Sequence, residues 1–135
     1  LPKKEMPACL SAATITANFV IDIRENWANS ANKFFDGLAA GKPILLNHGG
    51  WMQDLVLEHE CGLSLYGKKI EFAAKELDLA ISNKAWLKST GESAKMLAKK
   101  LFDRNIHTVQ LEKVFHLAIN NKPKLTEQVS KNFFA

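Results

Sequence analysis

The stretch PILLNHGG, from Pro43 to Gly50, constrains the fold more than any other part of the chain. Three apolar residues follow a proline and lead through Asn47 and His48 into two glycines. A short apolar run between such breakers is typical of a parallel strand that is buried on both faces. Since parallel strands need crossover connections, usually helices, this strand predicts an alternating α/β chain.

The flanking segments complete the alternation. Residues 34 to 39 place apolar side chains at helical spacing, Gly41 ends that helix, and Asn29 or Ser30 is predicted to cap its start. Residues after 68 keep helical spacing nearly to the end of the chain. The other predicted elements are a helix over 6–13, a strand over 16–23, a strand over 43–47, a helix over 51–60 and a strand over 61–67.

Right-handed crossovers fold this order into a small parallel sheet covered by helices on both faces. We therefore expect an α/β, Rossmann-like fold with a helical C-terminal part. The chain has 135 residues, of which 47% are hydrophobic and 24% charged, as in one compact domain. Residues 1–119 are predicted to form it, with 120–135 as a tail. The start LPKK, without an initiator Met, predicts a cut inside a larger protein.

Composition excludes several classes of function. A net charge of +4 without interleaved aromatic residues argues against a nucleic-acid partner. Cys9 and Cys61 lie far apart, without a CxxC motif, so we expect two buried thiols in a reducing compartment and no metal site. Since no apolar run approaches the roughly 20 residues needed to cross a bilayer, a cytoplasmic location is predicted.

The carboxyl ends of the strands are the predicted ligand site, as in other open parallel sheets. The helix that starts near Ser30 offers free N–H groups and a positive dipole end to a phosphate. Gly49 and Gly50 let the backbone approach a ligand where a Cβ would clash. Asp36, about one and a half turns into the helix, is placed to accept hydrogen bonds from sugar hydroxyls.

The stretch NKFFDGLAAGKPILLNHGGW, residues 32–51, resembles the donor-binding signature in the C-terminal domain of GT-B glycosyltransferases, especially the retaining family 4 group. Members of that group carry an acidic residue before a run of small residues with Gly and Pro, then a strand and a Gly-Gly loop. LPKKEMPACLSAATI is similar to the family's preceding helix, and HECGLSLYG to a later strand entry. The resemblance covers roughly residues 1–115.

The resemblance implies a nucleotide-sugar donor, most simply a UDP-sugar, and neither a cofactor nor a metal. It implies that the diphosphate is bound by Ser30, Ala31, Asn32 and Lys33, and the ribose by Asp36. The family's catalytic site also uses an N-terminal domain, so the catalytic residues stay unknown and no turnover is expected from this chain alone. The full enzyme would transfer a hexose, with retention, to a polysaccharide or lipid-linked acceptor in bacterial cell-surface glycan synthesis. Many members carry a Glu where this chain has Ala28.

Each assignment has a simpler alternative. Asp36 and Lys33 are by default solvated surface residues, and the two glycines can serve a turn alone. His48 near the loop is by default structural or exposed. The basic residues of one later stretch predict either a solvated face or contact with anionic lipid at the inner face of the plasma membrane: Lys95, Lys99, Lys100 and Arg104. A flavodoxin-like signalling or ligand-binding domain without catalysis is the alternative fold-level hypothesis.

Overall fold

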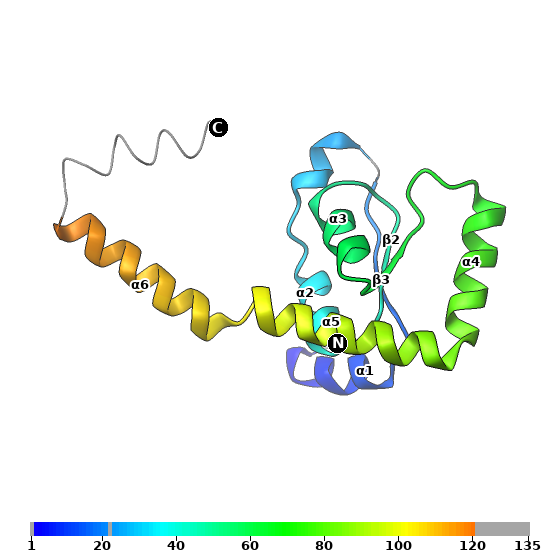
Figure 1. Ribbon diagram of the computed structural model, residues 1–135, viewed down its shortest axis with the longest axis horizontal. Helices are drawn as coiled ribbons and strands as arrows, with labels where there is room; N and C mark the ends of the chain where they lie inside the picture. The colour runs from blue at the N-terminus through cyan, green and yellow to red at the C-terminus, as the bar shows by residue number, and fades with distance from the viewer. Residues whose placement is uncertain (1, 22, 121–135) are drawn as a thin grey trace. The chain divides into compact units, whose positions relative to one another are not determined.

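The computed structural model describes residues 2–21 and 23–120, drawn as a ribbon in Figure 1. By compactness the chain divides into two units, Leu1–Leu101 and Phe102–Ala135. The predicted tail, 120–135, lies outside the described residues except for Asn120. The described elements are η1 (Lys3–Glu5), α1 (Met6–Ala12), β1 (Thr16–Asn18), η2 (Arg24–Ala28), α2 (Asn32–Ala39), β2 (Ile44–Leu46), α3 (Trp51–Glu58), β3 (Gly62–Ser64), α4 (Ile70–Ser82), α5 (Lys84–Leu101) and α6 (Arg104–Asn120).

The three strands form one parallel sheet in the order β1-β2-β3. Ile44 of β2 is in register with Thr16 of β1 and with Gly62 of β3. All three residues of β2 are buried, which confirms the prediction that this apolar run is a central parallel strand. The α/β class, with helices flanking a parallel sheet and a helical C-terminal part, is confirmed as well.

Helices α2 and α3 pack on the same face of the sheet. A Cβ added to Gly37 of α2 would lie 2.9 Å from Ile44 Cδ1 and 3.1 Å from Thr16 Cβ, so α2 approaches β1 and β2 closely. On α3, Met52 Sδ accepts a hydrogen bond from Asn18 Nδ2 at 3.4 Å. Because Thr16 and Asn18 are two residues apart on one strand, their side chains point to the same face. Figure 1 shows both helices on one side of the strands and α4 on the other.

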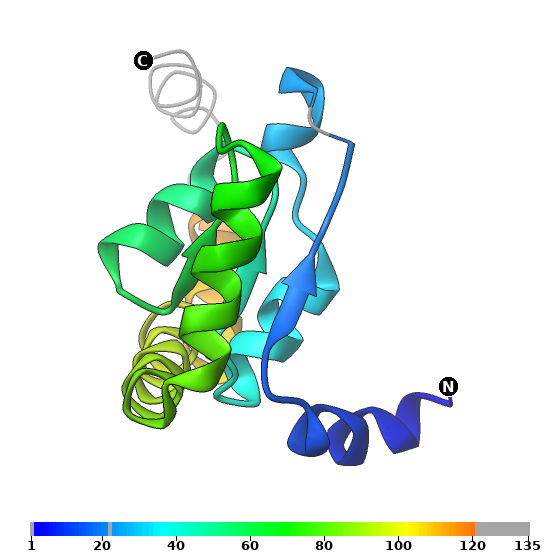
Figure 2. The same cartoon turned by 90° about the vertical axis from the view of Figure 1, so that its right-hand side faces the viewer.

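The core lies between this face and the two helices. Phe34, Leu38, Met52 and Val56 are fully buried against the residues of β2. Burial of each such side chain contributes roughly 1.5–3 kcal/mol. The opposite face is covered less completely than predicted. In Figure 2 helix α4 runs beside the strands, but only Ala73 and Ala80 of that helix are buried.

The first strand is shorter than predicted, because its pairing partner ends early. β1 ends at Asn18, opposite Leu46, the last residue of β2. Beyond that point the side chain of Asn47 takes the place of main-chain pairing between the strands. Its Oδ1 accepts a hydrogen bond from Val20 N at 3.0 Å, and its Nδ2 donates one to Val20 O at 2.9 Å. The apolar residues of the predicted extension are exposed, Phe19 by 47%, Ile21 by 77% and Ile23 by 48%.

The two cysteines differ in environment. Cys61 is buried at the entry to β3, as predicted, whereas Cys9 is exposed, so the prediction of a second buried thiol is wrong. Helix α1, which carries Cys9, has no buried residue, because its apolar residues Met6 and Leu10 line an open groove beside α2 and are only half-buried there. The apolar spacing identified a helix correctly but did not identify what covers it.

Candidate functional site

The carboxyl ends of β1 and β2 lead into two segments that lie side by side. β1 continues into η2 and the turn before α2, and β2 continues through the Gly-Gly loop into α3. Trp51, the first residue of α3, donates from Nε1 to the carbonyl of Asn29 at 3.1 Å. Its ring stacks on Phe35 with ring centres 6.2 Å apart. The predicted diphosphate segment and the Gly-Gly loop are therefore neighbours.

The start of α2 differs from the prediction in its cap. Ala31 is the N-cap residue, and no side chain forms a capping hydrogen bond there, so the predicted caps Asn29 and Ser30 are wrong. The backbone N–H of Phe34 donates a hydrogen bond to Ala31 O at 2.9 Å. Asn32 and Ser30 are exposed at this end. No side chain therefore satisfies the N–H groups of the first turn, and the positive dipole end of the helix carries no capping group.

Lys33 and Asp36 lie one turn apart on α2, and both are exposed. Lys33 Nζ donates to the carbonyl of Phe19 at 3.3 Å, which holds the ammonium group just beyond the carboxyl end of β1. Asp36 lines a groove of about 400 Å³ between α1 and α2, together with residues such as Met6 and Leu10. The carboxylate thus opens toward α1 and away from the Gly-Gly loop.

The two glycines of the loop are crowded by the chain itself. A Cβ on Gly49 would lie 3.0 Å from Cζ2 of Trp27, and one on Gly50 would lie 2.6 Å from the carbonyl oxygen of Trp27. Gly50 also has a φ of 96°, in a region that side chains rarely adopt. Internal packing of η2 therefore accounts for both glycines. Their predicted role as a backbone approach to a ligand stays a prediction.

Beneath this edge lie two buried polar side chains. His48 is fully buried, and its Nδ1 lies 2.8 Å from the carbonyl of Gly49. Since a carbonyl only accepts, Nδ1 carries the proton, and Nε2 has no partner within residues 2–21 and 23–120. Asn18 Oδ1 is likewise buried without a partner there. His48 is thus a structural residue, as its simpler alternative held, and it is not exposed at the site.

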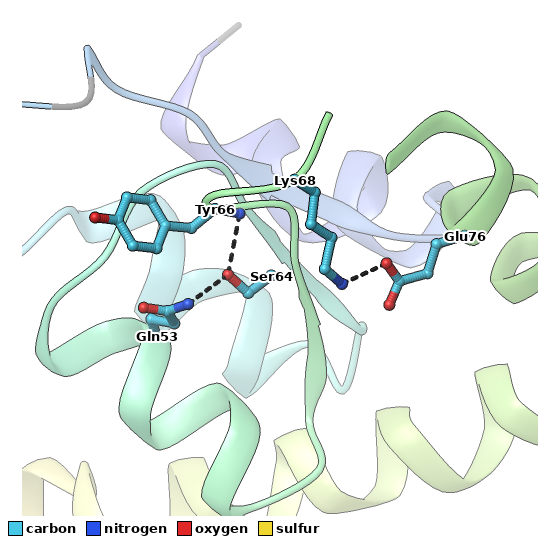
Figure 3. Close-up of polar contacts among 5 residues, drawn as sticks. All are labelled: Gln53, Ser64, Tyr66, Lys68 and Glu76. Carbon is cyan, nitrogen blue, oxygen red and sulfur yellow. Dashed lines mark hydrogen bonds and ion pairs between the residues drawn. The ribbon is translucent and has the colours of Figure 1, made fainter. Parts of the chain in front are cut away.

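The exit of β3 carries a polar cluster that the sequence did not reveal. Figure 3 shows Ser64 Oγ between two donors, Gln53 Nε2 at 2.9 Å and the backbone N–H of Tyr66 at 3.3 Å. Lys68 pairs with Glu76 of α4 nearby. The cluster fixes the turn after β3, and Tyr66 meets Trp27 edge-to-face at 5.5 Å between ring centres. No periodic signal marks such contacts, because their partners lie on different elements.

Several predictions about partners concern surfaces outside this edge. Lys95, Lys99 and Lys100 are exposed on α5, whereas Arg104 begins α6 in the other unit. Over residues 2–21 and 23–120 no helix is long and apolar enough to cross a membrane. The same residues contain no cluster of three His, Cys, Asp or Glu side chains arranged to hold a metal ion.

Comparison of the chain with protein-family models, with curated proteins and with solved structures gives no match. A function for the carboxyl edge can therefore be inferred only from its sequence and geometry. Its chemistry consists of an uncapped helix start, an exposed ammonium group on Lys33 and an exposed carboxylate on Asp36.

Proposed function

We propose that the chain is the donor-binding part of a GT-B glycosyltransferase and binds a nucleotide diphosphate sugar at the start of α2. The proposal is supported above all by one observation. Helix α2 begins at the carboxyl edge of a parallel sheet without a side-chain cap, and it carries Lys33 and Asp36 one turn apart. A dipole end and a cation suit a diphosphate, and an exposed carboxylate one turn further along the helix suits the hydroxyls of a ribose.

In this proposal the diphosphate accepts hydrogen bonds from the N–H groups of residues 30–33, and Lys33 adds a charge-assisted contact. Asp36 lies three positions after Lys33, a rise of about 4.5 Å, and in this proposal its carboxylate accepts hydrogen bonds from the ribose hydroxyls. During transfer, charge develops on the departing diphosphate. The same N–H groups and the ammonium stabilise that charge, while the bound nucleotide is held in position.

The acceptor and the remaining catalytic groups belong, in this proposal, to an N-terminal domain. A polysaccharide or lipid-linked acceptor at the inner face of the plasma membrane fits the resemblance to enzymes of cell-surface glycan synthesis. The exposed lysines of α5, Lys95, Lys99 and Lys100, supply the positive surface that anionic lipid attracts. This chain alone binds the donor and does not turn it over.

Ligand-observed NMR tests the donor site directly, with UDP, GDP, ADP and UDP-N-acetylglucosamine as probes. We expect one base to give signal, and Asp36→Asn or Lys33→Gln to weaken binding about tenfold, since each removes a hydrogen bond to a charged group. Asp78→Asn and Lys75→Gln on α4 are matched controls, because both side chains are exposed on a helix that is not part of the proposed site. Silence from all four probes, or binding unchanged by both site variants, overturns the proposal.

A further inference from the structure

A second pocket lies at the opposite, amino edge of the sheet. It has a volume of about 350 Å³ and lies between the end of α3, the first residue of β3 and one face of α5. This volume is at the lower end of the range for small-molecule sites, about 300–1,000 Å³. Trp86, Thr90 and Ser93 line it from α5, and Glu60 and Gly62 line it from the opposite side.

Among the polar side chains of this pocket, the hydroxyl of Ser89 donates to the carbonyl of Trp86 at 3.2 Å. Within residues 2–21 and 23–120, no hydrogen bond or ion pair engages the Trp86 indole N–H, the Glu60 carboxylate or the hydroxyls of Thr90 and Ser93. Thr90 is nevertheless only 4% exposed. The side chain of Glu60 is exposed and those of Trp86 and Ser93 are half-buried, so their polar groups are open to solvent and to a ligand in the pocket. A ligand with several hydroxyl groups would supply hydrogen-bond partners for them.

The backbone at Glu60 supports a role for this side chain. Cys61 N donates to Val56 O at 3.1 Å, which closes the end of α3 around Glu60. Glu60 has a φ of 49°, and within the described residues it alone has a positive φ without being glycine. At this position after a helix, glycine is the residue with the least strain. This conformation ends α3 and sets the position of the exposed Glu60 side chain at the pocket.

We propose that this pocket binds one pyranose unit of a glycan chain. The Glu60 carboxylate accepts hydrogen bonds from the hydroxyl groups of the sugar, and the hydroxyls of Thr90 and Ser93 both donate and accept. The Trp86 indole offers an N–H donor and an apolar surface for the C–H face of the sugar. An anionic ligand is disfavoured by the Glu60 carboxylate, and a wholly apolar ligand would leave the polar groups unpartnered. The site is separate from the proposed donor site at the carboxyl edge.

A neighbouring pocket indicates a chain of sugars. It measures about 250 Å³, shares Ser93 with the first, and is lined further along α5 by Met96, Leu97 and Lys100, with His59 opposite. Two adjoining pockets along one helix match successive units of an oligosaccharide. A trisaccharide is therefore expected to bind more tightly than its monosaccharide.

The indole ¹⁵N–¹H signals of the three tryptophans provide the test. We expect glucose, and at lower concentration maltotriose, to shift the signal of Trp86 but not that of Trp51, whose N–H is bonded to Asn29. Glycerol serves as the control polyol. No shift of Trp86 with either sugar, or an equal shift with glycerol, overturns the proposal. Equal affinity for the two sugars overturns the assignment to a glycan chain.

Variants separate this site from the donor site. Glu60→Gln and Ser93→Ala should each weaken sugar binding, the first by about tenfold, since a hydrogen bond to a charged group is lost. Glu58→Gln is the matched control, because Glu58 is exposed close by but does not line the pocket. Asp36→Asn should leave the Trp86 shift unchanged even if nucleotide binding fails. Sugar affinity that is the same in Glu60→Gln and Glu58→Gln refutes the role of Glu60.

Discussion

Replacing Gly50 by alanine tests the arrangement of the candidate site most severely. At Gly50 the backbone has φ 96° and ψ −172°, a combination that is essentially confined to glycine. A Cβ there would lie 2.6 Å from the carbonyl oxygen of Trp27 and 2.7 Å from its Cβ. Real Cβ atoms do not approach other heavy atoms within 3.0 Å, so either the loop or η2 must move.

Two terms set the magnitude of this effect. A residue held in such a backbone region costs about 1–3 kcal/mol. Forcing a methyl group into occupied space costs typically another 1–3 kcal/mol. We therefore expect Gly50→Ala to lower the free energy of unfolding by about 2–6 kcal/mol. It should also weaken nucleotide binding, because η2 leads into the start of α2.

Urea unfolding of matched variants separates the two terms. Gly67 has a φ of 70° with nothing within 4 Å of an added Cβ, so Gly67→Ala reports backbone strain alone, about 1 kcal/mol. Gly49→Ala reports crowding, since the three heavy atoms nearest to its Cβ would all belong to the ring of Trp27, at 3.0–3.3 Å. Its cost should disappear when Trp27 is also replaced by alanine. The cost of Gly50→Ala should persist in that background, because the Trp27 backbone remains.

Equal destabilisation by Gly50→Ala and Gly67→Ala would refute this reasoning, because crowding by Trp27 would then contribute nothing. Full rescue of Gly50→Ala by Trp27→Ala would also refute it. Either result would favour the prediction that Gly49 and Gly50 are needed to let a ligand come close to the backbone. Circular dichroism of each variant confirms that the comparison is made between folded proteins.

The remaining predictions concern the core and the buried thiol. Leu46→Ala removes a fully buried side chain from the central strand and should cost about 2–5 kcal/mol in urea unfolding, whereas Leu57→Ala, at an exposed position, should cost far less; equal costs would contradict the assigned core. Burial raises the pKa of the Cys61 thiol from 9.0 to about 11, against a smaller lowering by a backbone hydrogen bond. Below pH 9 the thiol is protonated in the folded and in the unfolded protein. Between pH 9 and 11 it is deprotonated in the unfolded protein only, so the free energy of unfolding falls by about 2–3 kcal/mol over this range. In Cys61→Val the decrease in the free energy of unfolding between pH 9 and 11 should be smaller by about 2–3 kcal/mol. In the unchanged protein a thiol reagent at pH 8 should label Cys9 but not Cys61.

Much of the fold was predictable because its signals are local. The apolar run Ile44–Leu46 between a proline and two glycines identified the central strand, and helical spacing identified α2 and α3. The end of β1 at Asn18 was not predictable in the same way, and the predicted strand over 16–23 was too long. Residues 19–23 have β-type composition, but β2 provides no main-chain partner beyond Leu46, and Asn47 bonds Val20 instead.

The candidate site was predictable only in part. The sequence placed Lys33 and Asp36 on one helix at the carboxyl edge of a parallel sheet, because the topology of such sheets brings helix starts to that edge. It did not predict that α2 begins at Ala31 without a side-chain cap. It also gave no sign of the amino-edge pocket, whose residues, Glu60 and Trp86 among them, come from separate elements.

The sequence by itself determined which segments become strands and helices, their order, and the burial of the central strand. Those properties follow from the spacing of apolar residues within a few turns or strand positions. Only the tertiary structure decided that Trp27 occupies the space beside Gly49 and Gly50, that Cys61 is buried while Cys9 is exposed, and that Asp36 faces α1. Each of these depends on contacts between elements distant in the chain, which packing sets and local spacing does not encode.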